Sequence, residues 1–275
     1  MKRQARFTTG STMRHVIVMT TTGMIGLTFM FLIDAITLFW VSKLENESFM
    51  AAMGFAWTVQ FFTISFGIAF MIATTALVSR SLGAENWEDA RKQTSVFALL
   101  TFVILSITVF FLLTFNKEIL ASIGASGTVL ETASTFLLIS VPSLPIMAIG
   151  MIGSAVLRAE GDGFRSMMVT ISSGIVAAIV DPLFIFGFDM GIQGAALGVS
   201  VARIVSAILA IYFVIKVKDL AATINFQDVK KWYLPFTMIA IPTLLTQLAS
   251  PTGNMFATSV ISEFGESAMA GWAVL

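Results

Sequence analysis

The stretch QTSVFALLTFVILSITVFFLLTF, from Gln93 to Phe115, decides the fold class. It contains no charged side chain over 23 residues. A helix needs about 20 apolar residues to cross the hydrocarbon core of a bilayer, so this stretch is long enough to span one. A helix that is hydrophobic on every side is buried in a large core or in lipid, and we predict a membrane-spanning helix here.

The same pattern recurs along the chain and predicts seven spanning helices. Their approximate ranges are 15–42, 49–79, 93–115, 131–157, 166–188, 192–215 and 234–261, and an eighth apolar stretch begins near Ser267. The first is too long for the apolar core of a signal peptide, so we expect it to be retained. The second would be roughly 46 Å long as one continuous helix, which predicts a tilt or a projection into the cytoplasm.

The composition agrees with an all-α integral membrane protein. Hydrophobic residues make up 57% of the chain, charged residues 12%, and the mean hydropathy is +0.91. The charged share is about half that of a soluble domain, too little to cover a water-exposed surface. The net charge is zero, so no basic footprint indicates a nucleic-acid partner.

The sequence lacks residue types and motifs that are typical of soluble enzymes. The chain has no cysteine and one histidine, His15, which we interpret as an interfacial residue at a helix start. It has no Walker A loop, no dinucleotide-binding fingerprint and no HExxH motif. We therefore predict that the protein is not an enzyme, contains no ATP motor in this chain, and needs no cofactor.

The basic residues predict the orientation, because Lys and Arg concentrate on the cytoplasmic side of membrane proteins. With a cytoplasmic N-terminus, the outer segments hold Lys43 and Lys117, and Arg203 lies within a span. The remaining 13 fall on the inside: Lys2, Arg3, Arg6, Arg14, Arg80, Arg91, Lys92, Arg158, Arg165, Lys216, Lys218, Lys230 and Lys231. We predict a multi-pass protein of the inner (plasma) membrane with its N-terminus in the cytoplasm.

Three charged residues lie inside predicted spans, where each costs about 2.5–3.5 kcal/mol on insertion scales and usually faces a cavity or a partner. Asp34 and Asp181 each lie about seven or eight residues from the outer end of their stretch, so their depths match. The pair predicts a site for a proton or a cation, although carboxylates that only tie helices together are the alternative. Arg203 either forms an ion pair with an aspartate or contacts a substrate.

Uncharged candidates accompany them. Pro182 follows Asp181 directly and cannot donate to the carbonyl of Ala178, which predicts a kink with a freed carbonyl beside the carboxyl group. Gln60 and Gln247 are candidates for lining a cavity or for bonding between helices.

Several segments together resemble the multidrug and toxic compound extrusion (MATE) family. The segment 155–163 (AVLRAEGDG) is similar to its LRAxGD loop, and 181–196 is similar to its LDPxxIFG…GxxGAA stretch. The segment 76–84 (ALVSRSLGA) and Ile241-Pro242, with Phe264-Gly265 and 268–270 after it, also fit the family.

The resemblance implies a secondary antiporter that exports drugs and amphipathic organic cations in exchange for H⁺ or Na⁺. Its acidic coupling residues match Asp34 and Asp181 by motif position. The family often has Asn four residues before the second aspartate, and here Ala177 stands there. This favours H⁺ as the coupling ion over Na⁺ bound at the two aspartates. The stretch 234–261 has no membrane-embedded Glu, and in this respect the chain resembles the DNA-damage-inducible (DinF-like) branch of the family.

The family's twelve-helix plan divides the chain. Residues 1–14 are expected to form a cytoplasmic N-terminus, 15–215 the six-helix N-lobe, 216–233 a cytoplasmic linker with an interfacial helix ending at Trp232 and Tyr233, and 234–275 the start of a C-lobe. We expect a missing C-terminal lobe and an inactive fragment. Two alternatives stay open: a lipid or polysaccharide flippase of the related superfamily, and a degenerate half-transporter that does not transport.

Overall fold

The computed structural model describes residues 10–44 and 47–272. All of the elements it describes are helices. They are α1 (Thr12–Ser42), α2 (Glu47–Gly83), α3 (Trp87–Thr114), α4 (Asn116–Ser122), α5 (Gly127–Ser140), the 3₁₀ turn η2 (Val141–Ser143), α6 (Leu144–Ala159), α7 (Gly163–Pro182), the π-helix η3 (Leu183–Gly187), α8 (Gly191–Tyr212), the π-helix η4 (Phe213–Val217), α9 (Phe226–Ser262) and α10 (Glu266–Trp272).

The prediction of an all-α membrane protein is confirmed. Six helices or helix pairs in the described residues are long and apolar enough to span a bilayer, and they match the last six predicted stretches. The first predicted stretch corresponds to α1, 31 residues long, in which the side chains of 27, 30, 31 and 34 lie outside the described part. The eighth stretch begins as α10.

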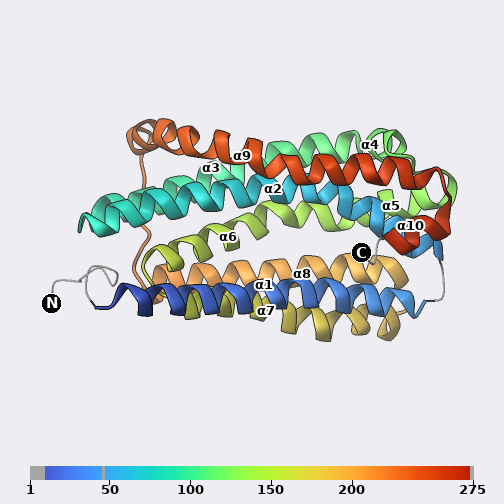
Figure 1. Cartoon of the computed structure of the whole chain (residues 1–275), viewed down its shortest axis with the longest axis horizontal. Coiled ribbons are helices and arrows are strands. Elements are labelled where there is room, and N and C mark those ends of the chain that lie inside the picture. Colours follow the sequence, from blue (N-terminus) through green and yellow to red (C-terminus); the bar gives the residue numbers. More distant parts are fainter. Residues whose placement is uncertain (1–9, 45–46, 273–275) are drawn as a thin grey trace.

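The helices form two layers with α6 between them (Figure 1). One layer contains α2, α3 and α9, and the other contains α1, α7 and α8. Small residues allow α6 to approach α8 closely: a β-carbon at Gly153 would lie 2.8 Å from the Cβ of Ala210. In a membrane such small contacts let dispersion forces hold helices together where the hydrophobic effect cannot.

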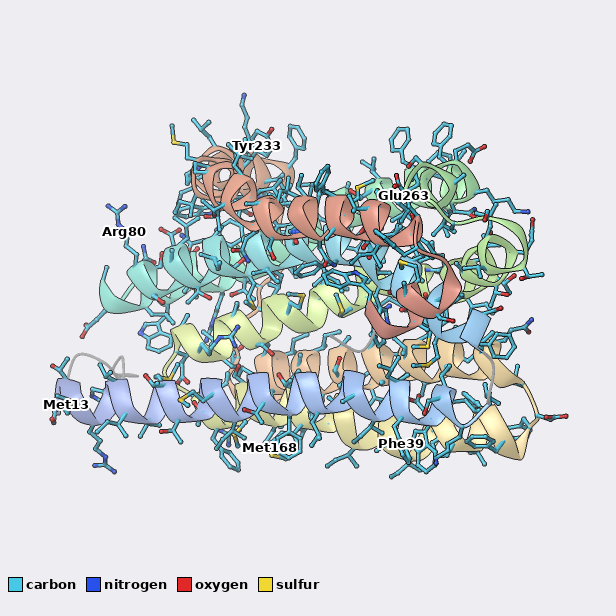
Figure 2. All side chains as sticks on the ribbon, turned by 45° about the vertical axis from the view of Figure 1, so that its right-hand side comes forward. Met13, Phe39, Arg80, Met168, Tyr233 and Glu263 are labelled. Atoms are coloured by element: carbon cyan, nitrogen blue, oxygen red, sulfur yellow. The ribbon has the colours of Figure 1, made fainter. Side chains whose placement is uncertain are left out.

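The helices alternate in direction, so most basic residues lie at one end of the bundle, as the sequence predicted. We call it the basic end; Figure 2 shows Arg80 and Met13 there. Lys43 and Lys117 follow helices that end on the opposite side. The basic end holds Arg14, Arg80, Arg91, Lys92, Arg158, Arg165, Lys216, Lys218, Lys230 and Lys231.

Two features differ from the sequence expectations. The stretch 131–157 is broken into α5 and α6 by η2, which contains Pro142. The helix expected within the linker is present, but it is continuous with the seventh span, because α9 begins at Phe226. Asn225 and Asp228 form a capping box that starts the helix there.

Residues assigned to the start of a C-lobe pack on the N-lobe helices. Phe236 of α9 is fully buried and stacks on Phe97 of α3, with 4.7 Å between ring centroids. Near the other end of α9, the hydroxyl groups of Thr58 and Thr258 lie 3.1 Å apart. Aromatic stacking and hydrogen bonding thus hold α9 against the α2–α3 layer.

Candidate functional site

Asp181 lies where α1, α7 and α8 meet. Its side chain is fully buried, with 0% of its surface exposed. The hydroxyl group of Thr37 on α1 donates a hydrogen bond to its Oδ2 atom at 2.5 Å. This bond joins residues that are 144 positions apart in sequence and places the carboxyl group level with position 37 of α1.

The other carboxyl oxygen of Asp181 faces α8. Its Oδ1 atom is buried and has no hydrogen-bond partner in the described part of the chain. A β-carbon at Gly198 would lie 2.0 Å from this atom and 3.3 Å from the Cα of Asp181. Only glycine therefore fits at position 198 while Asp181 keeps this rotamer.

The same face of α8 carries a second close contact one turn earlier. A β-carbon at Gly194 would lie 2.6 Å from the carbonyl carbon of Phe184 in η3. Gly194 and Gly198 form a GxxxG pair, whose spacing places both on one side of a helix and lets backbones approach. The two glycines thus hold α8 directly against the segment that contains Asp181.

The chemistry of this carboxyl group follows from its surroundings. Among the described residues, one donor serves the two buried oxygens of Asp181, whereas an ionised carboxylate in an apolar interior needs several donors or a countercharge. A group in this situation is suited to exchange a proton or a cation during function. Asp181 is thus a buried carboxyl group whose hydrogen bonding is incomplete among the described residues.

Asp34 belongs to α1, three residues before Thr37. At 1.5 Å per residue, position 34 lies about 4.5 Å along the helix axis from position 37. The backbones of the two predicted acidic positions therefore lie within about one turn of the same level. The side chain of Asp34 lies outside the described part of the structure.

Two residues near Asp181 on α7, Ala177 and Pro182, affect the site in different ways. Ala177, one turn earlier, is buried and supplies no side-chain oxygen. Pro182 is the last residue of α7, and the backbone continues as the π-helix η3. The kink at Pro182 and the freed carbonyl of Ala178 stay predictions, and what the structure describes is a π-helix directly after Pro182. Irregular π-turns are frequent at functional sites.

Arg203 and Gln60, predicted separately, lie together in the middle of the bundle. The Nη2 atom of Arg203 donates to Oε1 of Gln60 at 2.8 Å, and Nη1 donates to the carbonyl oxygen of Ser140 and the hydroxyl of Ser143, both at 3.0 Å. The hydrogen-bond donor described for Asp181 is Thr37, so Arg203 is not its described partner.

The break between α5 and α6 explains why Arg203 reaches a backbone carbonyl. The N–H group of Leu144 donates to Val141 in the 3₁₀ pattern, which leaves the carbonyl of Ser140 without its usual helix donor. The hydroxyl group of Ser143 donates to this carbonyl at 2.6 Å, and Arg203 adds a second donor. The guanidinium group thus satisfies the interrupted helix and joins it to α2 and α8.

Gln247 lies on α9, away from these contacts. It is half-buried, and its side chain makes no hydrogen bond to another described residue. The structure therefore brings Gln60 and Arg203 together but does not add Gln247 to their network.

The LRAEGDG segment forms an ionic cluster at the basic end. The Nζ atom of Lys218 lies 2.7 Å from Oε2 of Glu160 and 2.7 Å from Oδ2 of Asp162. Asp162 is buried, accepts a bond from the backbone N–H of Arg165 at the start of α7, and pairs with its guanidinium group. Burial raises the pKa of Asp162, but hydrogen bonds from Lys218 and Arg165 outweigh it and hold the pKa below its usual value.

The segment after η4 is fixed to α3 by further polar contacts. Arg91 pairs with Asp219, and the backbone N–H of Ala222 donates to the hydroxyl of Ser95 at 3.0 Å. The Nζ atom of Lys231 lies 2.9 Å from Oδ1 of Asp89. The residues expected to form a linker are thus held at several points along α3.

The sequence analysis did not identify Thr37 and Gly198, two described residues in direct contact with the Asp181 carboxyl group. Two signals were present. Gly194-Ala195-Ala196-Leu197-Gly198 is a GxxxG motif, and Thr37 follows Asp34 by one helical turn. Neither signal says which helix the residue faces, because that depends on contacts between segments far apart in sequence.

Comparisons with known proteins agree with the fold. Residues 23–183 match the family model described as MatE. The multidrug export protein MepA of Staphylococcus aureus (strain bovine RF122 / ET3-1) is 25% identical over 255 residues, which cover 91% of this chain and 56% of MepA. MepA of Staphylococcus haemolyticus (strain JCSC1435) is 24% identical, with the same coverage.

Solved structures show the same helix arrangement. A crystal structure of a MATE protein in the bent conformation has a TM-score of 0.78 and 22% identity, and the match covers 87% of this chain and 54% of that one. An inward-facing multidrug resistance MATE transporter of the MOP superfamily has a TM-score of 0.78 and 23% identity, with 94% and 60% covered.

The chain spans about half the length of the relatives it matches. The family model matches residues 23–183, which are more than half of this chain. The helical fold and the sequence motifs agree with that match. This multi-pass membrane protein therefore belongs to the MatE family.

Proposed function

We propose that this chain forms the ion-coupling lobe of a secondary antiporter that exports drugs and amphipathic organic cations in exchange for H⁺ or, less favoured, Na⁺. The observation that carries the proposal is Asp181: a fully buried carboxyl group at membrane depth, with a single hydrogen-bond donor in the part of the chain that the structure describes. The relatives named as multidrug export proteins support the substrate class.

Asp181 couples ion exchange to helix position through its two contacts. Its Oδ2 atom is held by Thr37 of α1, and its Oδ1 atom lies against Gly198 of α8. A proton arriving at or leaving the carboxyl group changes both contacts at once. The π-helix after Pro182 is the place where α7 can adjust, because its wider turn is held by longer-range backbone bonds than an α-helix.

The ligand set favours H⁺. Hard cations need several oxygen ligands, typically six or so, arranged around the ion. Asp181 and Thr37 supply oxygens, whereas Ala177 stands where an additional amide oxygen would have to come from. A proton needs only one free carboxyl oxygen, and Oδ1 of Asp181 has no described partner.

The remaining candidates have supporting roles in this proposal. Asp34 is the second carboxyl group of the coupling site, with its backbone within about one turn of Thr37. Arg203 and Gln60 hold the α5–α6 break in place, and Gln247 contributes to a cavity wall. The N-terminus lies in the cytoplasm of a plasma-membrane protein, and a second lobe is the expected partner for transport.

Proton release on substrate binding tests the proposal with the chain itself. Tetraphenylphosphonium is added to the purified chain in weakly buffered detergent solution containing a pH indicator, with and without NaCl. We expect proton release from the wild type in Na⁺-free solution, and its loss in Asp181→Asn and Asp34→Asn. The control is Asp189→Asn, which changes an exposed carboxylate in the turn after η3.

Equal release by all variants would remove the coupling role of the two aspartates. Release that depends on Na⁺ instead, with sodium displaced by the cation, would reassign the coupling ion and leave the site in place.

A further inference from the structure

The connection between α8 and α9 crosses the basic end of the bundle. It leaves the layer of α1, α7 and α8 after η4 and enters the layer of α2, α3 and α9 at Phe226, as Figure 1 shows. We call its residues Lys218–Ala222 the strap. Whether the strap is a slack tether or a tie between the two layers depends on the contacts that its residues make.

The first residue of the strap is held by the turn between α6 and α7. The Nζ atom of Lys218 lies 2.7 Å from a carboxylate oxygen of Glu160 and 2.7 Å from one of Asp162, and the three side chains are 9, 14 and 5% exposed. Asp162 also pairs with Arg165, so these four side chains carry two positive and two negative charges. Removing one partner from a buried ion pair leaves an uncompensated charge, so this contact resists opening.

The next residue is held from the other layer. The backbone of Asp219 has a φ of +47°, in the left-handed region that aspartate adopts more readily than most residues. Arg91 of α3 holds this turn at two points: its Nε atom donates to the carbonyl oxygen of Asp219 at 2.8 Å, and its guanidinium group pairs with the carboxylate. Two contacts from one planar group fix orientation as well as distance.

The rest of the strap is buried or bonded along α3. The side chain of Leu220 is 0% exposed and belongs to the hydrophobic cluster that contains Phe97 of α3 and Phe236 of α9. The backbone N–H of Ala222 donates to the hydroxyl of Ser95 at 3.0 Å. The strap therefore enters the second layer by apolar burial as well as by charge.

The order of these contacts along the chain leaves no slack. Lys218 is fixed to the start of α7 and Asp219 to α3, and the Cα atoms of consecutive residues are about 3.8 Å apart. Both contacts can persist only while the start of α7 and the start of α3 keep their separation. At its other end α7 carries Asp181, in its last turn, far along the helix from the strap.

We propose that the strap is a clamp, which holds the two layers of the bundle together at the basic end and confines their relative movement to the opposite end. The inference rests on the contacts of the strap and not on the proposed export function. The competing outcome is a strap that adds to the overall stability of the protein without holding one end in particular.

Distances between spin labels at the two ends of the bundle test the clamp. The chain contains no cysteine, so pairs of introduced thiols carry nitroxide labels without background. Arg80→Cys with Phe164→Cys reports the separation of the layers at the basic end. Thr114→Cys with Leu183→Cys reports it at the opposite end, and all four positions are exposed and helical. Double electron–electron resonance is recorded on the purified chain in lipid nanodiscs.

Lys218→Met and Arg91→Met remove the two ionic contacts of the strap separately. In the wild type we expect a narrower distance distribution at the basic end than at the opposite end. Each variant should add a population that is roughly 5 Å longer at the basic end, the size of a one-turn helix shift, and leave the opposite pair unchanged. Lys216→Met removes an exposed lysine two residues before the strap and should leave both pairs as in the wild type.

Basic-end distances that stay unchanged in both variants would overturn the clamp. Equal broadening at the two ends, in the variants or already in the wild type, would do so too, because it would show general looseness. The side chain of Arg91 is 35% exposed and its partner Asp219 58%, so Arg91→Met leaves no buried charge unpaired. This variant decides the question if Lys218→Met does not fold.

Discussion

Gly198 faces Asp181 so closely that a β-carbon at position 198 would lie 2.0 Å from the carboxyl Oδ1 atom. The contact involves a side chain with 0% exposure, so the space cannot be gained by moving Asp181 into solvent. The packing of α8 against the end of α7 therefore depends on the position of the Asp181 carboxyl group, and the reverse is also true.

Gly198→Ala is expected to destabilise the protein by about 1–3 kcal/mol, the usual cost of inserting a methyl group into a close-packed interior. It should also reduce proton release on binding of tetraphenylphosphonium, because the carboxyl group must leave its position. Thermal unfolding and the pH-indicator assay check both effects. The control is Gly23→Ala in α1, where a β-carbon meets nothing within 4 Å and an unchanged or slightly higher stability is expected.

Thr37→Val removes the hydroxyl donor to Asp181 and keeps the side-chain shape. Leaving a buried oxygen without its partner costs roughly 1–3 kcal/mol. We expect a lower unfolding temperature and a shifted pH dependence of proton release in Thr37→Val, and near wild-type behaviour in Thr37→Ser, which retains the donor. A valine variant with the wild-type pH profile would show that the bond does not participate in coupling.

Arg203→Met removes the donors to Gln60, Ser140 and Ser143 and leaves the Gln60 amide oxygen without this bond. The expected destabilisation is about 1.5–3 kcal/mol, the range for hydrogen bonds made by charged groups. A double-mutant cycle with Gln60→Leu isolates the pair. Additive effects of the two substitutions would mean that the Arg203–Gln60 contact contributes nothing of its own.

Acid should weaken the ionic cluster around Asp162. Its folded-state pKa is depressed, so the stabilisation is present above the unfolded value of 3.8 and is lost as the pH falls below it towards the folded value. Asp162→Asn should lower the unfolding temperature at neutral pH and flatten its dependence on pH in the acidic range. The comparison variant is Asp189→Asn, an exposed carboxylate whose replacement should leave both measurements close to wild type.

Sequence patterns sufficed for the spans because length and apolar composition are local properties. The stretch 93–115 became α3, and alternation of basic residues correctly grouped Arg80, Arg91, Arg165 and Lys218 at one end. Asp34 and Asp181 stood out because they are charged residues inside apolar stretches, and this required no knowledge of their contacts. These inferences needed no knowledge of which helices are neighbours.

The contacts of the site could not be obtained in the same way. Thr37 meets Asp181 across 144 residues, and Arg203 meets Gln60 across 143. No periodicity within a helix encodes which partner lies opposite. The break at η2 was also missed, although Pro142 and Pro145 were visible, because a proline can end a helix, kink it or stand in its first turn.

Lys92 with Asp228 and Lys231 with Asp89 attach the first turns of α9 to the first turns of α3. Farther along the same helix, Phe236 stacks on Phe97 and Thr258 lies against Thr58, so the contacts there are not made by charges. Salt screens interactions between charges near the surface, so a higher ionic strength should loosen the beginning of α9 before the rest of the helix.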